Sequence, residues 1–362
     1  MDLGAILVVG SNSAAGEGIS VVHEWQEYLE GNPIASIEVL GQSILQRTIG
    51  RLQSEGVTEI AVVSAGKIAS LLGQRPERGT VYGLGDAWSA AQPRLGKYFE
   101  SGCDSVLLIR LGAYVELELT QLLQFHREQR QEITPVYDGE GPVDYWLLDA
   151  SLHRQTNFID PVVAKISVAA DVAPFRTSGY VNRLADARDL RQLVADSFLG
   201  RCQIRPNGIQ KKPGVWVDQG AQIHRRARLV APAYIGRNVK VQSDALITRC
   251  SSLERGCEVG YGTVVEDASI LAGTYLGAGL DVTHAVVSGS MLVNLRHDVA
   301  LQINDPQLLS GPKMHFKPAH ATPSGVLAPV HTNLEAGTDG LRGSRHAPEP
   351  GFVASTRSAW AG

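Results

Sequence analysis

Residues 233–265 read AYIGRNVKVQSDALITRCSSLERGCEVGYGTVV and carry the pattern that decides the fold of the C-terminal part of the chain. A branched aliphatic residue occurs at every sixth position, and a small or β-branched residue stands two positions before it. A period of six fits neither a helix, with its period of 3.6, nor a single strand, which alternates with a period of two. It predicts short strands that each point one large and one small side chain inward and are separated by turns.

The same spacing extends beyond this stretch in both directions. The aliphatic positions are Val217, Ile223, Leu229, Ile235, Val241, Ile247, Leu253, Val259, Val265 and Leu271. One residue is missing from the pattern after Leu271, and the spacing resumes at Leu276 and Val282. We therefore expect residues 214–290 to form about four coils of three six-residue units each, with Cys257 as a small core residue.

Residues 1–200 have a different spacing of apolar residues. Helical patterns alternate there with short apolar runs that are typical of buried parallel strands, which predicts an α/β fold with a doubly wound sheet. The expected strands are Ala5–Val9, Glu59–Val63 and Val106–Ile109, and the expected helices are 41–56, 86–101, 117–130 and 186–199. The predicted organisation is an α/β domain at 1–204, the repeat region at 205–303 and a disordered tail rich in proline, glycine and histidine at 304–362.

The composition of the 362 residues excludes several classes of protein. A net charge of −4 gives no bulk attraction to nucleic acid, and no apolar run reaches the length of about 20 residues that spans a membrane. The start of the chain lacks the basic region of a secretory signal, and the four cysteines form no CxxC pair, so we expect reduced thiols and a cytoplasmic protein. The first lysine or arginine is Arg47, and six carboxylates precede it.

Three stretches resemble elements of the sugar-1-phosphate nucleotidyltransferases. They are Ile37–Leu45 with the following Arg51-Leu52 and Gly56–Ile60, the helix sequence LTQLLQFH at Leu119–His126, and Gly179-Tyr180. The resemblance implies a nucleotidyltransferase-like, Rossmann-like sheet domain followed by a left-handed parallel β-helix of hexapeptide repeats. It also implies the reaction of a nucleoside triphosphate with a sugar 1-phosphate, in which carboxylates hold Mg²⁺ on the triphosphate.

The residues that would serve this chemistry are partly replaced. The loop after the first expected strand keeps glycines and a serine, whose backbone amides could bind phosphate. It lacks the arginine that the family has there, and Glu17 would repel a triphosphate. The two metal carboxylates of the family fall on Gly112 and Arg183, so no metal site is predicted. The candidate substrate-binding residues are Gly10, Ser11, Gly16, Gly18, Gly85, Arg110 and Arg183.

The sequence supports three functional hypotheses and leaves open whether the protein is an enzyme. The first is a catalytically impaired binding or regulatory subunit of nucleotide-sugar or polysaccharide metabolism. In it, Arg110 and Arg183 either bind a phosphate directly or form ion pairs with Glu116 or Glu118. The second is an active nucleotidyltransferase that holds Mg²⁺ through Asp104 or Glu116. The third is an acyltransferase with His284, in the repeat region, as its general base.

The expected partners are a sugar phosphate or nucleotide sugar and further copies of the chain that associate through the β-helix, but neither nucleic acid nor a membrane. A basic cluster within the repeats is either a solvated face or a surface for an anion or another subunit. This cluster consists of Arg225, Arg226, Arg228, Arg237 and Lys240. The nucleotide, the sugar, the stoichiometry and the role of the tail are not determined by the sequence.

Overall fold

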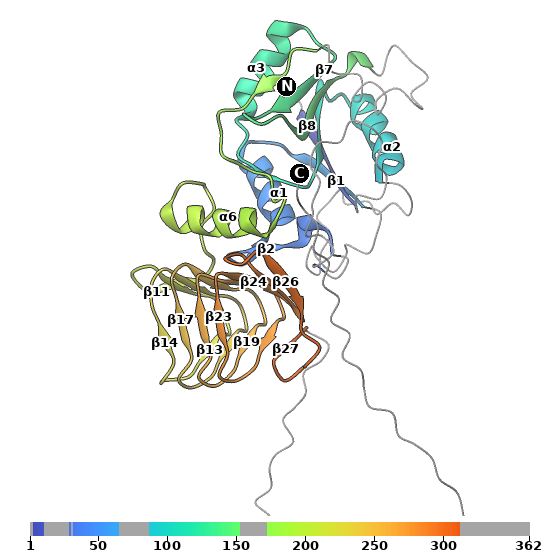
Figure 1. Ribbon diagram of the computed structural model, residues 1–362. Coiled ribbons are helices and arrows are strands. Elements are labelled where there is room, and N and C mark those ends of the chain that lie inside the picture. The colour runs from blue at the N-terminus through green and yellow to red at the C-terminus, as the bar shows by residue number, and fades with distance from the viewer. Residues whose placement is uncertain (1–2, 11–28, 30–31, 65–86, 153–171, 312–362) are drawn as a thin grey trace, which may run out of the picture. The chain divides into compact units, whose positions relative to one another are not determined.

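The computed structural model describes residues 3–10, 29, 32–64, 87–152 and 172–311, which lie within one compact unit, Met1–Lys317. Its first part is an α/β arrangement around a six-stranded sheet (Figure 1). In spatial order the strands are β4 (Glu59–Ser64), β1 (Leu3–Val9), β5 (Ser105–Arg110), β8 (Pro142–Asp149), β7 (Ile133–Tyr137) and β9 (Phe175–Arg176).

This sheet is mixed rather than wholly parallel. Strand β1 lies parallel to β4 and β5, as the sequence predicted, whereas β8 lies antiparallel to both β5 and β7. Two short ladders complete this part of the chain. They are formed by β2 (Glu38–Val39) with β3 (Gln42–Ser43), and by β6 (Tyr114–Val115) with β10 (Val181–Asn182).

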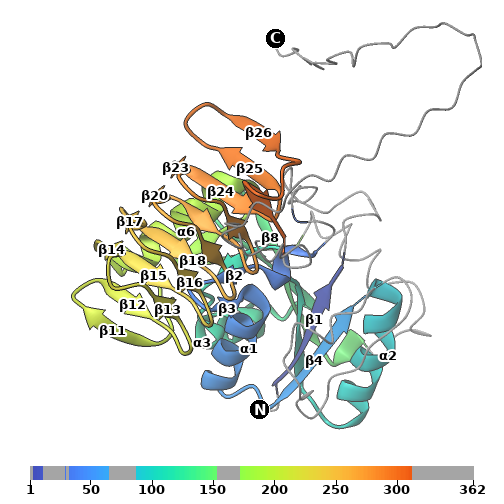
Figure 2. The same ribbon diagram turned by 90° about the horizontal axis from the view of Figure 1, so that it is seen from below.

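Helices cover both faces of the sheet, because alternate residues of its buried strands point to opposite sides. Ile6 and Val8 of β1 pack with α2, while Ala5, Leu7 and Val9 belong to a core that includes α1, α3 and α6. Figure 2 shows β1 and β4 between α1 and α2. The four helices lie within three residues of their predicted bounds: α1 (Ile44–Ser54), α2 (Ala87–Glu100), α3 (Leu119–Gln129) and α6 (Ala187–Leu199), and a short 3-10 helix, η2, spans Ile34–Ser36.

The second part of the chain, residues 209–310, distributes consecutive short strands in rotation among three sheets that are rich in parallel pairs. The first sheet contains β11 (Ile209–Lys212), β12 (Val215–Val217), β15 (Ala233–Ile235), β18 (Ser251–Leu253), β21 (Ser269–Ile270), β24 (Ala285–Ser288), β25 (Met291–Asn294) and β26 (Val299–Gln302). The second contains β13 (Gln222–Ile223), β16 (Lys240–Val241), β19 (Glu258–Val259), β22 (Tyr275–Leu276) and β27 (Leu309–Ser310). The third contains β14 (Arg228–Leu229), β17 (Leu246–Thr248), β20 (Val264–Glu266) and β23 (Asp281–Thr283).

The interior of these sheets follows the six-residue spacing as far as Val265 and then departs from the prediction. Ile270, not Leu271, pairs with Leu253 and is fully buried in their shared core, with Ala268 in the small position before it. Leu271 instead packs into the core of the α/β part. The six-residue spacing is therefore shortened by one residue before Ile270, in the turn at Asp267 between β20 and β21. The segment Gly277–Gly279 keeps the regular spacing.

A buried carboxyl group from the second part holds a tight turn of the first. Glu254, which is 1% exposed, accepts hydrogen bonds from the amides of Leu40 and Gly41, each at 2.9 Å. Both turn residues have positive φ, 51° and 95°, as a two-residue hairpin loop requires. On the other side of the turn, Arg47 donates to the carbonyls of Val39, at 2.5 Å, and Leu40. The two parts therefore share a common polar junction as well as an apolar core.

The predicted tail at 304–362 falls almost wholly outside the described residues, since these end at residue 311. Among the described residues, no helix combines the length and the apolar character that a membrane span needs.

Candidate functional site

The two positions that the family resemblance assigns to metal carboxylates come together in the structure. Strand β6 pairs antiparallel with β10 so that Tyr114 lies opposite Asn182. Gly112 precedes Tyr114 by two residues and Arg183 follows Asn182 directly, so both positions leave the same end of this ladder. The backbone therefore brings together the two places where a metal would need acids, but they carry a glycine and an arginine.

Arg183 is held in place by carboxylates of the β7–β8 connection. Its Nη2 lies 2.5 Å from Asp138 Oδ1, and its Nε lies 3.2 Å from Glu140 Oε2. Burial alone would raise the pKa of Asp138, but hydrogen bonds from Arg183 and from the amides of Glu140 and Gly141 outweigh it and lower that pKa. The carboxyl group of Asp138 is therefore ionised at neutral pH.

Arg110, the last residue of β5, lies beside the start of β8 and forms an ion pair with an acid of that strand. Its Nη1 is 3.5 Å from Asp144 Oδ2, while Arg183 donates to the carbonyl of Pro142, two residues away on the same strand. Both arginines therefore lie near the start of β8, and both form ion pairs with acids of this region. The predicted partners Glu116 and Glu118 were wrong, because the acids are Asp144, Asp138 and Glu140.

The acids suggested for an active enzyme lie elsewhere. Asp104 precedes the first residue of β5, at the end of the strand opposite Arg110. Glu116 is buried and accepts hydrogen bonds from the hydroxyl of Tyr114, at 2.8 Å, and from the amide of Gln203. Within the ranges that the structure describes, no group of three or more histidine, cysteine and acidic side chains is arranged to hold a metal ion.

Only part of the predicted phosphate loop can be placed. Gly10 is exposed and directly follows β1, at the carboxyl end of that strand, where α/β sheets bind ligands. Ser11, Gly16, Gly18 and Gly85 lie outside the described residues.

His284 lies in the turn between β23 and β24, and its contacts there were not predicted from the sequence. Its Nδ1 is 2.6 Å from Asp267 Oδ2, and the other oxygen of Asp267 is 2.6 Å from Nη2 of Arg191, which is nearly fully buried on α6. Arg191 also donates to Ser269 Oγ and to the carbonyl of Cys250. A carboxylate that is anchored on one side by arginine fixes the orientation of the imidazole on its other side.

The strand register explains this juxtaposition. Cys250, Asp267 and His284 are 17 residues apart, follow the neighbouring strands β17, β20 and β23 of the third sheet, and all have positive φ. Because paired residues of β20 and β23 are also 17 residues apart, Asp267 and His284 lie side by side at the ends of these strands. Asp267 was missed because a lone aspartate in a turn resembles any other turn residue, and the one usable signal was the 17-residue spacing.

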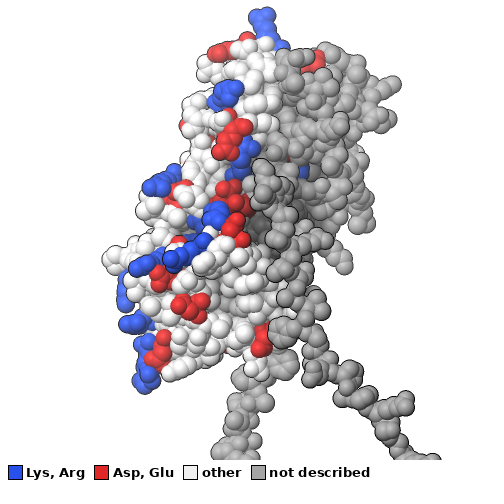
Figure 3. All heavy atoms as spheres, in the orientation of Figure 1, with Lys and Arg blue, Asp and Glu red and all other residues white. Residues whose placement is uncertain are grey.

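The predicted basic cluster contributes to a mixed charged surface on the second part (Figure 3). Two of its members pair with acids at the neighbouring strand of the same sheet: Arg226 with Asp244 at 3.0 Å, and Lys240 with Glu258 at 3.6 Å. For these two residues, the interpretation as a solvated, ion-paired face is favoured over an anion site.

The chain matches no known protein-family model, and no curated protein sequence matches it either.

Proposed function

We propose that this chain is a nucleotidyltransferase-like protein in which the α/β part precedes a left-handed parallel β-helix, and that it binds a sugar phosphate or nucleotide sugar without turning it over. The role that follows is that of a regulatory or binding subunit in nucleotide-sugar or polysaccharide metabolism. The rotation of strands among three sheets, with inward residues every six positions, supports the β-helix.

The proposal rests mainly on one observation: Gly112 and Arg183 both lie at the same end of the β6–β10 ladder. Nucleotidyl transfer needs acids at such a place to hold the metal that bridges the triphosphate. Here the guanidinium of Arg183 brings positive charge instead, and the nearby acids Asp138 and Glu140 are occupied by it. A ligand phosphate would compete with Asp138 and Glu140 for Arg183, and with Asp144 for Arg110, which suits reversible binding better than metal-assisted transfer.

The test combines turnover with binding. We expect no pyrophosphate release from a panel of nucleoside triphosphates and sugar 1-phosphates with Mg²⁺, since the metal-holding acids are replaced. Without Mg²⁺, at least one sugar phosphate or nucleotide sugar is expected to raise the melting temperature of the protein. Turnover of about 1 s⁻¹, the low end for ordinary enzymes, would contradict the loss of catalysis.

The binding site is located by variants. Arg110→Ala is expected to abolish the ligand-induced rise in melting temperature, whereas Arg188→Ala, an exposed arginine on α6, leaves it unchanged. If no compound of the panel stabilises the native protein, the binding proposal is wrong.

A second candidate function, acyl transfer, is favoured by the His284–Asp267 contact of 2.6 Å. The ring of His284 is 37% exposed, so Nε2 is in reach of a substrate while Asp267 holds Nδ1. In this reaction Nε2 takes the proton of an acceptor hydroxyl or amine as that group attacks the thioester carbonyl of an acyl-coenzyme A. The carbon–sulfur bond then breaks, and the imidazolium returns the proton to the thiolate.

This candidate predicts thiol release from acyl-coenzyme A in the presence of hydroxyl or amine acceptors. His284→Ala is expected to lower the rate by about 10²-fold or more, the usual contribution of a general base. His224→Ala, an exposed histidine of the same part of the chain, serves as the control with full activity. Thiol release that survives His284→Ala would remove acyl transfer at this corner.

A further inference from the structure

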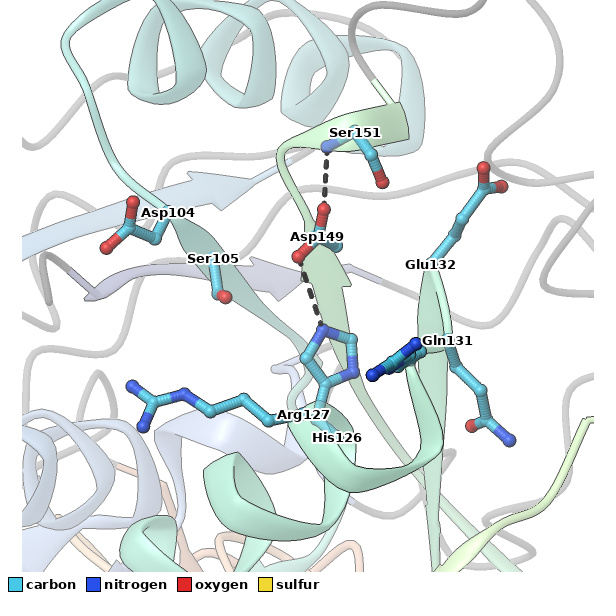
Figure 4. A pocket seen from close by; sticks show the side chains of 9 residues that line it. Asp104, Ser105, His126, Arg127, Gln131, Glu132, Asp149 and Ser151 are labelled. Atoms are coloured by element: carbon cyan, nitrogen blue, oxygen red, sulfur yellow. Dashed lines mark hydrogen bonds and ion pairs between the residues drawn. The ribbon is translucent and has the colours of Figure 1, made fainter.

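A hollow of about 600 Å³ lies at the end of the sheet opposite Arg110 and Arg183 (Figure 4). It is bounded by the start of β5, the end of β8 and the end of α3. Ser105 and Arg110 are the first and last residues of β5, so the hollow is about 17 Å from the arginine pair at 3.3 Å per residue. Its lining includes two arginines together with Asp104, Ser105, His126, Glu132, Asp149 and Ser151.

The tautomer of His126 follows from its neighbours. The Gln131 amide pairs with both backbone groups of Ala173 at 3.1 Å, an orientation that turns its nitrogen toward Thr134 Oγ1 at 3.3 Å. Thr134 therefore accepts from Gln131 and donates its own hydroxyl proton to His126 Nδ1, which lies 2.7 Å away. Burial lowers the pKa of His126, against the opposing charge of Asp149, so the ring is neutral and carries its proton on Nε2.

This Nε2–H group has no hydrogen-bond acceptor, although the side chain is only 3% exposed. The carboxylate toward which it points, Asp149, lies 3.8 Å away, beyond hydrogen-bond distance. Figure 4 shows the two side chains facing each other at the hollow, and Asp149 itself is 40% exposed. An unpartnered buried donor is costly, so a group that accepts a hydrogen bond from Nε2–H at the hollow would be favourable there.

One hydroxyl group can interact with both side chains at once. Its oxygen accepts a hydrogen bond from His126 Nε2–H, and its proton is donated to Asp149 Oδ2. The rest of the lining suits further hydroxyls, since carboxylates accept from them and Ser105 and Ser151 both donate and accept. Three carboxylates, Asp104, Glu132 and Asp149, outnumber two guanidiniums, and the negative end of the α3 dipole lies at the same place. The hollow is therefore unfavourable for phosphate.

We propose that this hollow is a binding site for a small uncharged polyol, such as a free sugar, one hydroxyl of which bridges His126 and Asp149. The site is separate from the strand-end arginines and does not depend on the proposed function. The volume fits a single sugar unit with room for solvent.

The experiment is a titration of histidine-labelled protein with D-glucose, D-mannose, D-glucitol and glucose 6-phosphate, followed through the ring nitrogen signals of His126 by NMR. At least one uncharged polyol is expected to shift the Nε2 signal in a saturable manner, and glucose 6-phosphate is expected to bind more weakly than glucose. Asp149→Asn is expected to weaken the binding about tenfold or more, while Asp281→Asn, an exposed acid of β23, leaves it unchanged.

The titration of the native protein needs no variant, so it is decisive even if Asp149→Asn folds poorly. The absence of a saturable shift at His126 with all three uncharged polyols would overturn the proposal, as would tighter binding of glucose 6-phosphate. Equal affinity in a folded Asp149→Asn protein would overturn it as well.

Discussion

Replacement of Glu254 by alanine is expected to lower the free energy of unfolding by about 3 to 5 kcal/mol, because the buried amide of Leu40 and the partly buried amide of Gly41 lose the acceptor that Glu254 supplies. The turn itself is strained, since Leu40, a residue with a bulky side chain, has φ of 51°. Chemical denaturation of the native and variant proteins measures the difference. A change of less than about 1 kcal/mol would contradict the importance of this junction.

The same carboxyl makes stability depend on pH. Burial, together with the charge of Glu38, raises the pKa of Glu254 to about 8, against the two amide hydrogen bonds and Arg47, which favour ionisation. The folded protein therefore holds this proton more tightly than the unfolded chain, in which the pKa is near its ordinary value of 4.5. The stability that this proton contributes is fully present below about pH 4.5 and is lost as the pH rises through about 8.

Glu254→Gln isolates this effect, because glutamine keeps the shape and one acceptor but does not titrate. The free energy of unfolding of the native protein, taken relative to that of Glu254→Gln, is expected to fall between pH 5 and 9 by up to about 1.4 kcal/mol per pH unit. A difference that stays constant over this range would show that Glu254 does not titrate there.

Gly179→Ala is the second substitution with a large expected effect. A Cβ atom at Gly179 would overlap the backbone oxygen of Glu116, so β10 would have to move away from β6. We expect a loss of about 3 kcal/mol in the free energy of unfolding, since a backbone atom cannot yield as a flexible side chain can. The ladder that positions Gly112 and Arg183 would be disrupted, and the proposed binding of a sugar phosphate or nucleotide sugar is expected to be lost with it.

The matched control is Gly50→Ala. Gly50 lies within α1, where a Cβ would meet nothing within 4 Å, so alanine is expected to stabilise the protein by about 0.5 to 1 kcal/mol through helix propensity. Denaturation midpoints compare the two variants directly. A Gly179→Ala protein as stable as the native one would mean that β10 is not held against Glu116 in solution.

Much of the fold is local in origin and was predictable. The apolar runs became β1, β4 and β5, and the six-residue spacing placed strands among three sheets, because each of these patterns repeats over a few residues. The antiparallel direction of β8 was not predicted, because apolar content alone does not give strand direction. The loss of one residue was recognised, but its position was assigned after Leu271 rather than at Asp267, since Ile270 and Leu271 are equally apolar.

The candidate sites depended far more on contacts between distant segments. Glu254 looks like an ordinary turn residue, yet its partners are 213 and 214 residues away. His126 belongs to a predicted helix, but its unpartnered nitrogen is seen only when β8 brings Asp149 near it. The acids around Arg110 and Arg183 were missed for the same reason, since nearby Glu116 and Glu118 were the only partners that sequence distance suggested.

The sequence by itself determined the repeat in residues 233–265, the alternation of strands and helices before it, and the identities of Gly112 and Arg183 at the two positions where the resemblance to nucleotidyltransferases led us to expect acids. These follow from local periodicity and residue identity. The tertiary structure alone decided which charges meet: Arg191 with Asp267 and His284, Glu254 with the Leu40–Gly41 turn, and His126 with Asp149. Such pairs depend on the register of strands and on how distant segments pack, and neither is encoded in any single stretch of the chain.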